Sequence, residues 1–358
     1  MRVHLLALPN VQTTAAYDLC GFCTVTIRFA KLLKGLGHTV ILYASEENDA
    51  PCDELVTCIT KAEQKQWGGA VAYQHANIAP DNPLWRLASP RMIAAIQQRK
   101  RPQDIICTIG GGSQADVTQA HPDLLPVEYC IGYEGCYSPY RVFQSQAWRH
   151  LCYGREGLKL GGRFFDEVIP AFYETDKFPV ATPENYLLYV GRIIPYKGIQ
   201  IACQAAQLAG VPLKLIGHGD PNQIPHLVTY GEYLGSLNEP ARNEVMSKAT
   251  ALICPTIYVE PMGMIAVEAQ LCGTPVISTD YGGFTESIEH GLTGYRCNLL
   301  GEFVSAIQKA GSLDRNLIRQ RAQALYSMEA GARLYANYFR RLMTLWDKGW
   351  NTESFEVL

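Results

Sequence analysis

Two glutamates separated by a glycine-bearing turn are the first residues whose types and spacing could do chemistry. Glu260 directly precedes Pro261-Met-Gly263, and Glu268 follows eight positions after Glu260. Apolar residues at helical spacing place Glu268 on the inward face of a helix that is predicted to follow Gly263 and to end at Gly273. A buried carboxylate costs several kcal/mol, as an order of magnitude, unless a group hydrogen-bonds to it. Ribose hydroxyls would be suitable donors, and a neighbouring backbone amide or an arginine is the alternative.

The start of this helix and an upstream loop could together bind an anion. The amides of Gly263, Met264 and Ile265 are expected to be free, because the first turn of a helix has no internal acceptors for them. A side chain at position 263 would obstruct the close approach of a phosphate. Arg192 and Lys197 lie in a loop predicted between a strand and a helix. A planar guanidinium and a compact ammonium can bind a diphosphate together. The alternative is a pair of solvated loop cations.

Strand and helix patterns alternate along both halves of the chain, and this predicts the elements that position these residues. In the first half, strands are predicted over residues 3–8, 39–44, 104–109 and 126–131, with a helix over 24–36. After a proline-containing linker at 172–186 the alternation begins again, with strands over residues 185–190, 212–216, 251–254 and 275–278. This order predicts two Rossmann-like, doubly wound α/β domains facing a cleft, with ligands at the carboxyl ends of the strands.

Composition excludes several classes of protein. The chain has 358 residues, 47% of them hydrophobic and 18% charged, which is typical of a globular protein of two domains. A net charge of -3 argues against a basic nucleic-acid binder. No apolar run is long enough to predict a membrane span. The 12 cysteines are interpreted as reduced thiols of a cytosolic protein. The motif Cys20-Gly-Phe-Cys23 is not accompanied by a second cysteine pair, so it does not predict a zinc site. The alternative is that its two thiols form a redox pair.

Six motifs in a fixed order carry a resemblance to a known family. The second half closely resembles the GT-B glycosyltransferases of family 4 (group 1), which are retaining and use nucleotide sugars. The matching pieces occur in the family's order over about residues 185–297: Tyr189-Val-Gly-Arg-Ile-Ile-Pro-Tyr-Lys-Gly198, Leu215-Ile-Gly-His-Gly-Asp220, Glu260-Pro-Met-Gly-Met-Ile-Ala-Val-Glu268, Cys272-Gly-Thr-Pro-Val-Ile277, Gly282-Gly-Phe-Thr-Glu286 and Gly291-Leu-Thr-Gly294.

The resemblance implies a role for each candidate site residue. Arg192 and Lys197 resemble the pair that binds the donor diphosphate, and Glu260 resembles the first carboxylate of an E-x7-E signature that contacts the transferred sugar. These three are the candidate catalytic residues. The remaining candidates would bind the donor: Met262, Gly263, Met264 and Ile265 by their amides to sugar and phosphate, Glu268 to the ribose, and Tyr233 and Leu234 beside the base.

The first half resembles the family less closely. Asp18-Leu-Cys-Gly21-Phe stands where the family has a glycine-containing loop, and this makes Gly21 a further donor-binding candidate. The segment 129–136 contains no histidine where many members carry one, and Tyr133 or Glu134 could substitute. His121 and His150 lie nearby in sequence, and no residue is assigned to the role.

The resemblance also implies a domain plan. Residues 1–172 are expected to form an N-terminal Rossmann-like domain that binds the acceptor, and residues 173–335 a C-terminal one that binds the nucleotide sugar. Residues 336–358 are expected to form a helix and tail that cross back onto the first domain.

The expected activity is transfer of a hexose from a UDP- or GDP-sugar to a hydroxyl of a glycan or lipid-linked acceptor, with retention at the anomeric carbon. No metal cofactor is expected, and polysaccharide biosynthesis in the cytoplasm is the implied setting. Peripheral contact with the inner membrane face is expected by analogy, through basic residues of the first half: Arg91, Arg99, Lys100, Arg101, Arg149, Arg155, Lys159 and Arg163. Solvated surface charges are the alternative.

Three other classes stay open as alternatives. The first is a GT-B enzyme of another class, either a phosphorylase or a sugar-nucleotide epimerase. The second is an NAD(P)-dependent oxidoreductase, against which the first strand lacks a following G-x-G-x-x-G. The third is a non-catalytic protein that binds sugar nucleotides.

Overall fold

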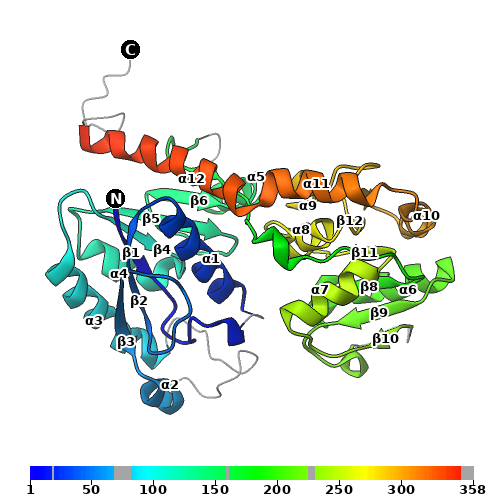
Figure 1. The fold of residues 1–358 in the computed structure, drawn as a ribbon, viewed down its shortest axis with the longest axis horizontal. Coiled ribbons are helices and arrows are strands. Elements are labelled where there is room, and N and C mark those ends of the chain that lie inside the picture. The colour runs from blue at the N-terminus through cyan, green and yellow to red at the C-terminus, as the bar shows by residue number, and fades with distance from the viewer. Residues whose placement is uncertain (18–19, 68–81, 159–160, 225–229, 348–358) are drawn as a thin grey trace. The chain divides into compact units, whose positions relative to one another are not determined.

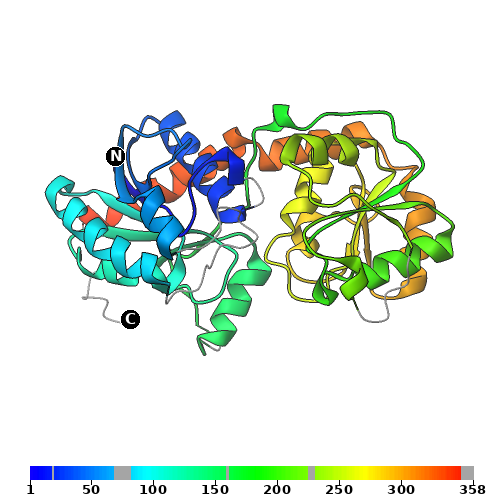
Figure 2. The same ribbon diagram turned by 90° about the horizontal axis from the view of Figure 1, so that it is seen from below.

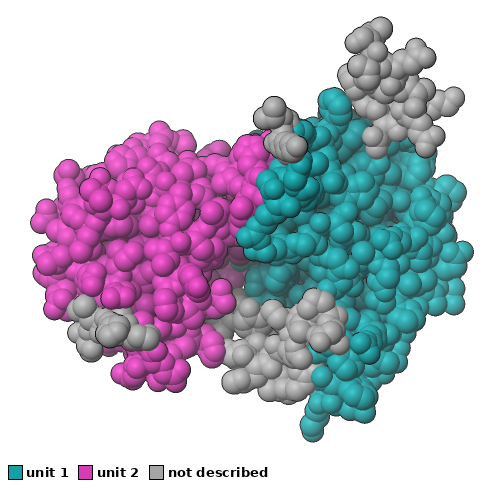
Figure 3. Space-filling model, turned by 180° about the vertical axis from the view of Figure 1, so that it is seen from behind, with its two compact units in different colours: residues 1–143, 152–170, 329–358 teal, residues 144–151, 171–328 magenta. Residues whose placement is uncertain are grey.

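The chain forms two compact units, each assembled from segments that are not contiguous in sequence. The computed structural model describes residues 1–17, 20–67, 82–158, 161–224 and 230–347. Unit 1 comprises Met1–Phe143, Cys152–Pro170 and Glu329–Leu358, and unit 2 comprises Gln144–Leu151 and Ala171–Met328 (Figure 3).

Unit 1 is built on a parallel sheet of seven strands in the order β3-β2-β1-β4-β5-β6-β7 (Figure 1). The strands are β1 (Arg2–Leu6), β2 (Thr39–Ser45), β3 (Glu54–Ile59), β4 (Ile105–Thr108), β5 (Leu125–Ile131), β6 (Tyr140–Phe143) and β7 (Glu167–Val168). The helices are α1 (Gly21–Gly35), α2 (Lys61–Trp67), α3 (Pro83–Arg99), α4 (Ala115–Gln119), α5 (Gln146–Arg155) and α12 (Met328–Met343), and the first residues of α5 belong to unit 2.

Helices cover both faces of this sheet because strand side chains alternate between the two faces. On one face Leu84 and Met92 of α3 join Tyr43 of β2 in a buried cluster. On the other, Phe29 of α1 stacks on Tyr129 of β5, with ring centroids 4.1 Å apart. Tyr335 of α12 also contacts Phe29, at 4.9 Å between centroids. Strand order reverses between β1 and β4, the position at which doubly wound sheets place their binding crevice.

Unit 2 repeats the architecture with six parallel strands in the order β10-β9-β8-β11-β12-β13 (Figure 2). The strands are β8 (Leu187–Val190), β9 (Leu213–Ile216), β10 (Glu232–Tyr233), β11 (Ala251–Cys254), β12 (Val276–Thr279) and β13 (Gly294–Cys297). The helices are α6 (Ile199–Ala209), α7 (Glu239–Lys248), α8 (Met264–Leu271), α9 (Phe284–Ser287), α10 (Leu300–Ala310) and α11 (Arg315–Tyr326).

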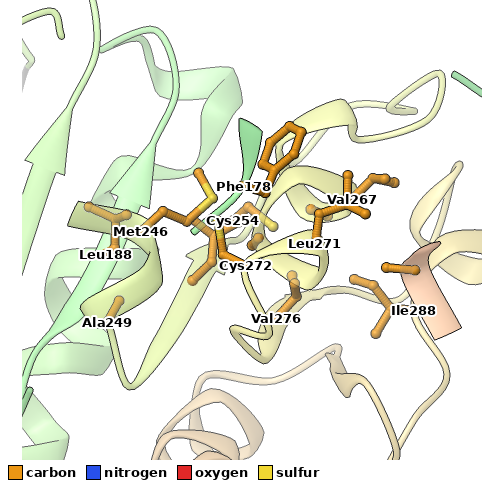
Figure 4. Close-up of a cluster of buried hydrophobic side chains, with 14 of the residues drawn as sticks. Phe178, Leu188, Met246, Ala249, Cys254, Val267, Leu271, Cys272, Val276 and Ile288 are labelled. Atoms are coloured by element: carbon orange, nitrogen blue, oxygen red, sulfur yellow. The ribbon is translucent and has the colours of Figure 1, made fainter. Parts of the chain in front are cut away.

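Neighbouring residues of the central strands of unit 2 enter two separate cores. Leu187 of β8 packs with Cys203 of α6 on one face. Leu188, the next residue, joins Met246 of α7 and Leu271 of α8 on the other face (Figure 4). A strand buried on both faces reads as a continuous apolar run, and this is why these strands could be predicted from the sequence.

The predicted doubly wound α/β architecture is confirmed in both units, whereas the segment boundaries differ from the expected plan. Gln144–Leu151 belongs to unit 2, although it was expected in the first domain. This segment contacts unit 2 directly, since the carboxylate of Glu286 accepts hydrogen bonds from the amides of Gln146 (2.8 Å) and Ala147 (2.9 Å). Unit 1 resumes at Glu329, so the expected boundary at residue 335 falls inside α12. Among the described helices none has both the length and the hydropathy to cross a membrane.

Candidate active site

The turn before α8 requires a glycine. Gly263 has a φ of 74°, in the left-handed region, and forms the N-cap of α8. A Cβ at this position would lie 2.3 Å from Cε1 of Phe284, so no other residue fits without a shift. From the sequence, the glycine is interpreted as making room for a phosphate. The structure shows a second reason for it, which is the space taken by the ring of Phe284.

The first amides of α8 are available to a ligand. The amide of Ala266 already donates to the carbonyl of Gly263 at 2.8 Å. The preceding amides, of Met264 and Ile265, have no acceptor among the described residues. They therefore provide two N–H donors at the positive end of the helix dipole, an arrangement that favours anions.

A second close approach brings the loop after β8 to the loop after β11. Gly198 has a φ of 71°, and a Cβ there would lie 1.9 Å from the carbonyl oxygen of Pro255. The carbonyl of Tyr196 accepts a hydrogen bond from the amide of Ile257 at 2.9 Å. These contacts fix the short 3-10 turn that ends at Lys197 beside the segment leading to Glu260.

Lys197 and Glu260 are in direct contact. The Nζ of Lys197 donates to Oε2 of Glu260 at 2.6 Å and to the hydroxyl of Tyr258 at 2.7 Å. The side chains of Lys197 and Glu260 are only 19% and 13% exposed. Burial is the largest single influence and lowers the pKa of Lys197, but the charges of Glu260 and Tyr258 and the hydrogen bonds to both together outweigh it, so the pKa is raised. Lys197 therefore carries its positive charge at neutral pH, inside a partly desolvated ion pair.

The backbone of Glu260 is fixed by the loop after β12. The amide of Gly283 donates to the carbonyl of Glu260 at 2.8 Å. The hydroxyls of Thr279 and Tyr281 donate to the carbonyl of Thr256 at 2.7 and 2.8 Å. The carboxyl ends of β8, β11 and β12 thus form one connected edge.

Arg192 lies on the same loop as Lys197 without contacting it. The amide of Ile193 donates to the carbonyl of His218 at 2.8 Å, and the carbonyl of Arg192 accepts from the hydroxyl of Tyr189 at 3.0 Å. The Arg192 side chain is exposed and pairs with no carboxylate in the described part of the chain. Of the two predicted cations, one is neutralised by Glu260 and the other carries an uncompensated charge.

Glu268 is buried, and its partner is an arginine. It is 5% exposed, and its Oε2 accepts from the guanidinium of Arg242 on α7 at 2.9 Å. Of the three candidate partners considered for this carboxylate, namely ribose, a backbone amide or an arginine, the structure shows an arginine. Sequence reasoning missed Arg242 and Tyr258 as individual residues. Tyr258 stands two positions before Glu260, and only that proximity could have suggested it.

Tyr233 and Leu234 brace the glycine-bearing loop after β9. The hydroxyl of Tyr233 lies 2.7 Å from the carbonyl oxygens of both Gly217 and Gly219. The amide of Leu234 donates to the carbonyl of Leu215 at 2.9 Å, and so is already used within the sheet. Of the two residues predicted to lie beside the base, Tyr233 has an exposed ring that a ligand could contact.

The first-half candidates occupy the carboxyl edge of unit 1. Gly21 is the first residue of α1, and a Cβ there would meet nothing within 4 Å, so no packing constraint requires a glycine. Asp18 and Leu19 of the same motif lie outside the described residues. Tyr133 donates to buried Glu128 at 3.0 Å, and burial raises the pKa of that carboxyl group.

The remaining first-half candidates are engaged or buried. Glu134 forms an ion pair with Arg155, and His121 is only 1% exposed. Most of the basic residues expected to contact a membrane also have carboxylate partners. The observed pairs are Arg91–Glu63, Arg99–Glu54, Lys100–Asp123, Arg155–Glu134 and Arg163–Glu156. Lys159 lies outside the described residues. No group of three or more metal-ligating side chains occurs among the residues that the structure describes.

Comparisons with known proteins show which families the second half of the chain resembles in sequence. Residues 173–309 match the family model described as glycosyl transferases group 1. The D-inositol 3-phosphate glycosyltransferase of Rhodococcus erythropolis is 31% identical over 129 residues. That match covers 31% of this chain and 29% of the relative, so the similarity spans less than a third of the relative's length.

Solved structures match almost the whole chain in fold. A sucrose-phosphate synthase from Thermosynechococcus elongatus superposes with a TM-score of 0.68 at 18% identity, covering 96% of this chain and 100% of the other. Anabaena HepE, solved in complex with UDP and glucose, gives a TM-score of 0.66 at 16% identity, with 95% and 99% covered. At these identities the likeness shows the fold alone, which is the GT-B arrangement of two Rossmann-like units. The match to the glycosyl transferases group 1 model covers residues 173–309, which lie within unit 2 and make up less than half of the chain.

Proposed function

We propose that this chain is a retaining glycosyltransferase of the family 4 type. It moves a hexose from a UDP- or GDP-sugar to a hydroxyl of a glycan or lipid-linked acceptor. The observation that carries the proposal is the contact of Lys197 with Glu260 at the carboxyl edge of unit 2, on the segment that leads into the free amides of α8. A cation from the loop after β8 thus contacts a carboxylate on the segment that leads into the backbone donors of α8.

The positive groups suit a leaving diphosphate. An ammonium group has three N–H donors, and two of those of Lys197 are used by Glu260 and Tyr258. The third remains for a phosphate oxygen. Arg192 adds an uncompensated charge, and the amides of Met264 and Ile265 add two donors. Charge grows on the diphosphate as the sugar–oxygen bond breaks, and groups already in place stabilise that charge most in the transition state.

The carboxylates suit the hydroxyl groups of the donor. Glu260 retains acceptor capacity after bonding Lys197, because a carboxylate offers about four lone-pair sites. We assign it to hydroxyls of the transferred sugar. Glu268 accepts from the ribose in addition to Arg242, and Tyr233 and Leu234 lie beside the base. We assign Gly21 of unit 1 to the diphosphate. The backbone amides of Met262 and Gly263 are assigned to the transferred sugar.

The acceptor hydroxyl attacks from the face of the leaving group, with a diphosphate oxygen taking its proton. No protein nucleophile and no metal cofactor are needed for this route. The proposed setting is polysaccharide biosynthesis in the cytoplasm, with peripheral contact at the inner membrane face. Flotation of the chain with anionic liposomes tests the contact: salt-sensitive binding supports it, and its absence removes it.

Thermal unfolding of the purified chain in the presence of UDP, GDP, ADP or TDP tests the donor site. A nucleotide at 100 times its Kd stabilises the folded state by about 2.7 kcal/mol, so one of the four should raise the Tm. The matching nucleoside, which lacks the diphosphate, serves as control and should have little effect. If none of the four nucleotides raises the Tm, the proposal is wrong.

Acceptor-free hydrolysis of the matching nucleotide sugar distinguishes an enzyme from a binding protein. Slow release of the sugar is expected, because water can replace the acceptor hydroxyl at a low rate. Proton NMR of the fresh product reports the anomeric configuration, which should be that of the donor. Binding without any release would support a non-catalytic protein, and an inverted product would exclude the retaining route.

A further inference from the structure

Unit 1 contains an open cavity of about 420 Å³ that takes no part in the site of unit 2. It is lined by Trp85, Arg86, Ser89 and Pro90 on the first half of α3, by the glycine-rich turn after β4, and by Asp116 at the start of α4. Its volume lies in the range of small-molecule sites, which is roughly 300–1,000 Å³. It adjoins the carboxyl end of β4, the edge at which open α/β sheets bind ligands.

Two side chains of the cavity are almost fully buried and lack hydrogen-bond partners. Ser89 and Trp85 are each only 7% exposed. The hydroxyl of Ser89 bonds to none of the described residues, and the indole Nε1 of Trp85 has no acceptor in the described part of the chain. Buried polar groups in native proteins are nearly always paired, so the indole N–H of Trp85 indicates a missing partner, whereas the Ser89 hydroxyl keeps some exposure to solvent.

A proline inside α3 provides a further unpaired group. Pro90 lies within the helix and has no amide hydrogen. The carbonyl of Arg86, four residues earlier, therefore lacks its normal helical donor. Both residues line the cavity, so a ligand hydroxyl could donate to this carbonyl.

The cavity also holds two opposite charges that do not pair. Arg86 and Asp116 are exposed, and neither forms an ion pair with any described residue. Other cations of α3 behave differently, since Arg91 pairs with Glu63 and Arg99 with Glu54. One oxygen of Asp116 accepts from the amide of Val117 at 2.9 Å, which leaves the other available.

These groups together select one chemical class of ligand. A carboxylate and a carbonyl accept hydrogen bonds, while a guanidinium and an indole N–H donate them, and serine hydroxyls do both. A purely anionic ligand would be repelled by Asp116, and an apolar one would leave every polar group unpaired. A polyhydroxylated ring supplies a donor and an acceptor at each hydroxyl, and its carbon–hydrogen faces suit an aromatic side chain. We propose that this cavity binds a neutral saccharide unit of the acceptor, a role that rests on the proposed glycosyl transfer.

Saturation-transfer NMR of the full chain tests saccharide binding directly. The probes are the methyl pyranosides of glucose, galactose and mannose together with myo-inositol, each at millimolar concentration, with inorganic phosphate as a separate arm monitored by competition. At least one saccharide should receive saturation. Asp116→Ala and Ser89→Val should each raise its Kd at least about tenfold, since each removes one hydrogen bond to the ligand. Asp123→Ala serves as the matched control, because that exposed carboxylate pairs with Lys100 outside the cavity.

The outcomes separate this inference from the proposed function. No binding by any of the three pyranosides or myo-inositol, equal binding by all variants, or competition by phosphate alone would overturn the saccharide subsite. Nucleotide-dependent thermal stabilisation is measured separately and decides the donor site. If a saccharide binds in the cavity and a nucleotide stabilises the chain, Asp116→Ala should raise the KM for the acceptor. The rate of acceptor-free donor hydrolysis should stay unchanged. An unchanged acceptor KM would overturn the assignment of the cavity to the acceptor.

Discussion

The carboxyl edges of the two sheets are fixed by different kinds of contact. In unit 2 the loops touch backbone to backbone: Gly198 packs on the carbonyl of Pro255, and the amide of Gly283 bonds to the carbonyl of Glu260. Only residues without a side chain allow such approaches.

In unit 1, a backbone bond joins Gly112 to Gly135 at 3.0 Å, and buried amide and carboxylate side chains each accept from two loop amides. The side chain of Gln114 accepts from the amides of Ile109 and Gly110 at 3.0 and 2.8 Å. The carboxylate of Glu128 accepts from the amides of Tyr137 and Ser138 at 2.9 and 3.1 Å. This kind of bracing permits changes in loop sequence as long as the buried acceptor stays, whereas the edge of unit 2 tolerates little change. Such a difference would suit glycosyltransferases that all bind a diphosphate in one unit but bind different acceptors in the other.

The largest expected effect tests the side-chain bracing of unit 1. Arg141 is 1% exposed and donates to the fully buried carboxylate of Asp166 at 2.6 Å. Arg141→Met should lower the free energy of unfolding by about 3–5 kcal/mol, because it leaves a buried charge uncompensated. Arg163→Met, at an exposed pair, should cost at most about 1 kcal/mol. Urea unfolding measures both, and equal losses would contradict the comparison.

A smaller effect tests the backbone packing of unit 2. Gly263→Ala should destabilise the protein by about 2–4 kcal/mol, because it combines left-handed strain with a clash against Phe284. Gly21→Ala is the matched substitution in unit 1, where the added methyl group meets nothing. It should leave stability unchanged or raise it by up to about 1 kcal/mol. The comparison would fail if the two variants showed the same Tm.

The proposed chemistry is tested at the ion pair. Lys197→Ala should reduce kcat by about 100-fold, equivalent to about 2.7 kcal/mol, by removing charge from the departing diphosphate. Lys248→Ala removes an exposed lysine of the same unit that pairs with Glu244, and it should leave kcat unchanged. Steady-state kinetics with the matching donor provide the measurement. A Lys197→Ala enzyme within twofold of the parent would rule out the assigned role.

The smallest expected effect separates two roles of Glu268. Glu268→Ala and Arg242→Ala break the same buried pair, so they should cost similar stability. Only the loss of Glu268 removes the proposed ribose acceptor, which should raise the Kd of the matching nucleotide about tenfold, or about 1.4 kcal/mol. Calorimetric titration of both variants distinguishes the roles, and equal Kd values would make Glu268 a structural residue only.

The same difference between the two units explains what the sequence could predict. Close backbone approaches require glycine at set positions, so Gly198, Gly263 and Gly283 fall into spaced motifs that a reader can find. Those motifs predict the positions of Lys197, Glu260 and the start of α8 from the sequence alone. Continuous apolar runs likewise predicted the central strands, because these strands are buried on both faces.

The unpredicted features depend on contacts between residues distant in sequence. Arg242 reaches Glu268 across 26 positions, from a helix with no pattern that marks the arginine as special. The cavity beside Trp85 joins α3 to the turn after β4, and its key signals are missing partners, which a sequence does not show. The membership of Gln144–Leu151 in unit 2 depends on Glu286, about 140 positions later.

The discontinuous assembly of unit 1 sets an order for events on the ribosome. Unit 2 has all of its residues once Met328 has emerged, whereas unit 1 still lacks α12 and the contact of Tyr335 with Phe29. Domains often fold during synthesis from the N-terminus onward. In this chain the half that is begun first is completed last, so a nascent chain whose residues up to 328 have left the ribosome should hold a finished unit 2 and an unfinished unit 1.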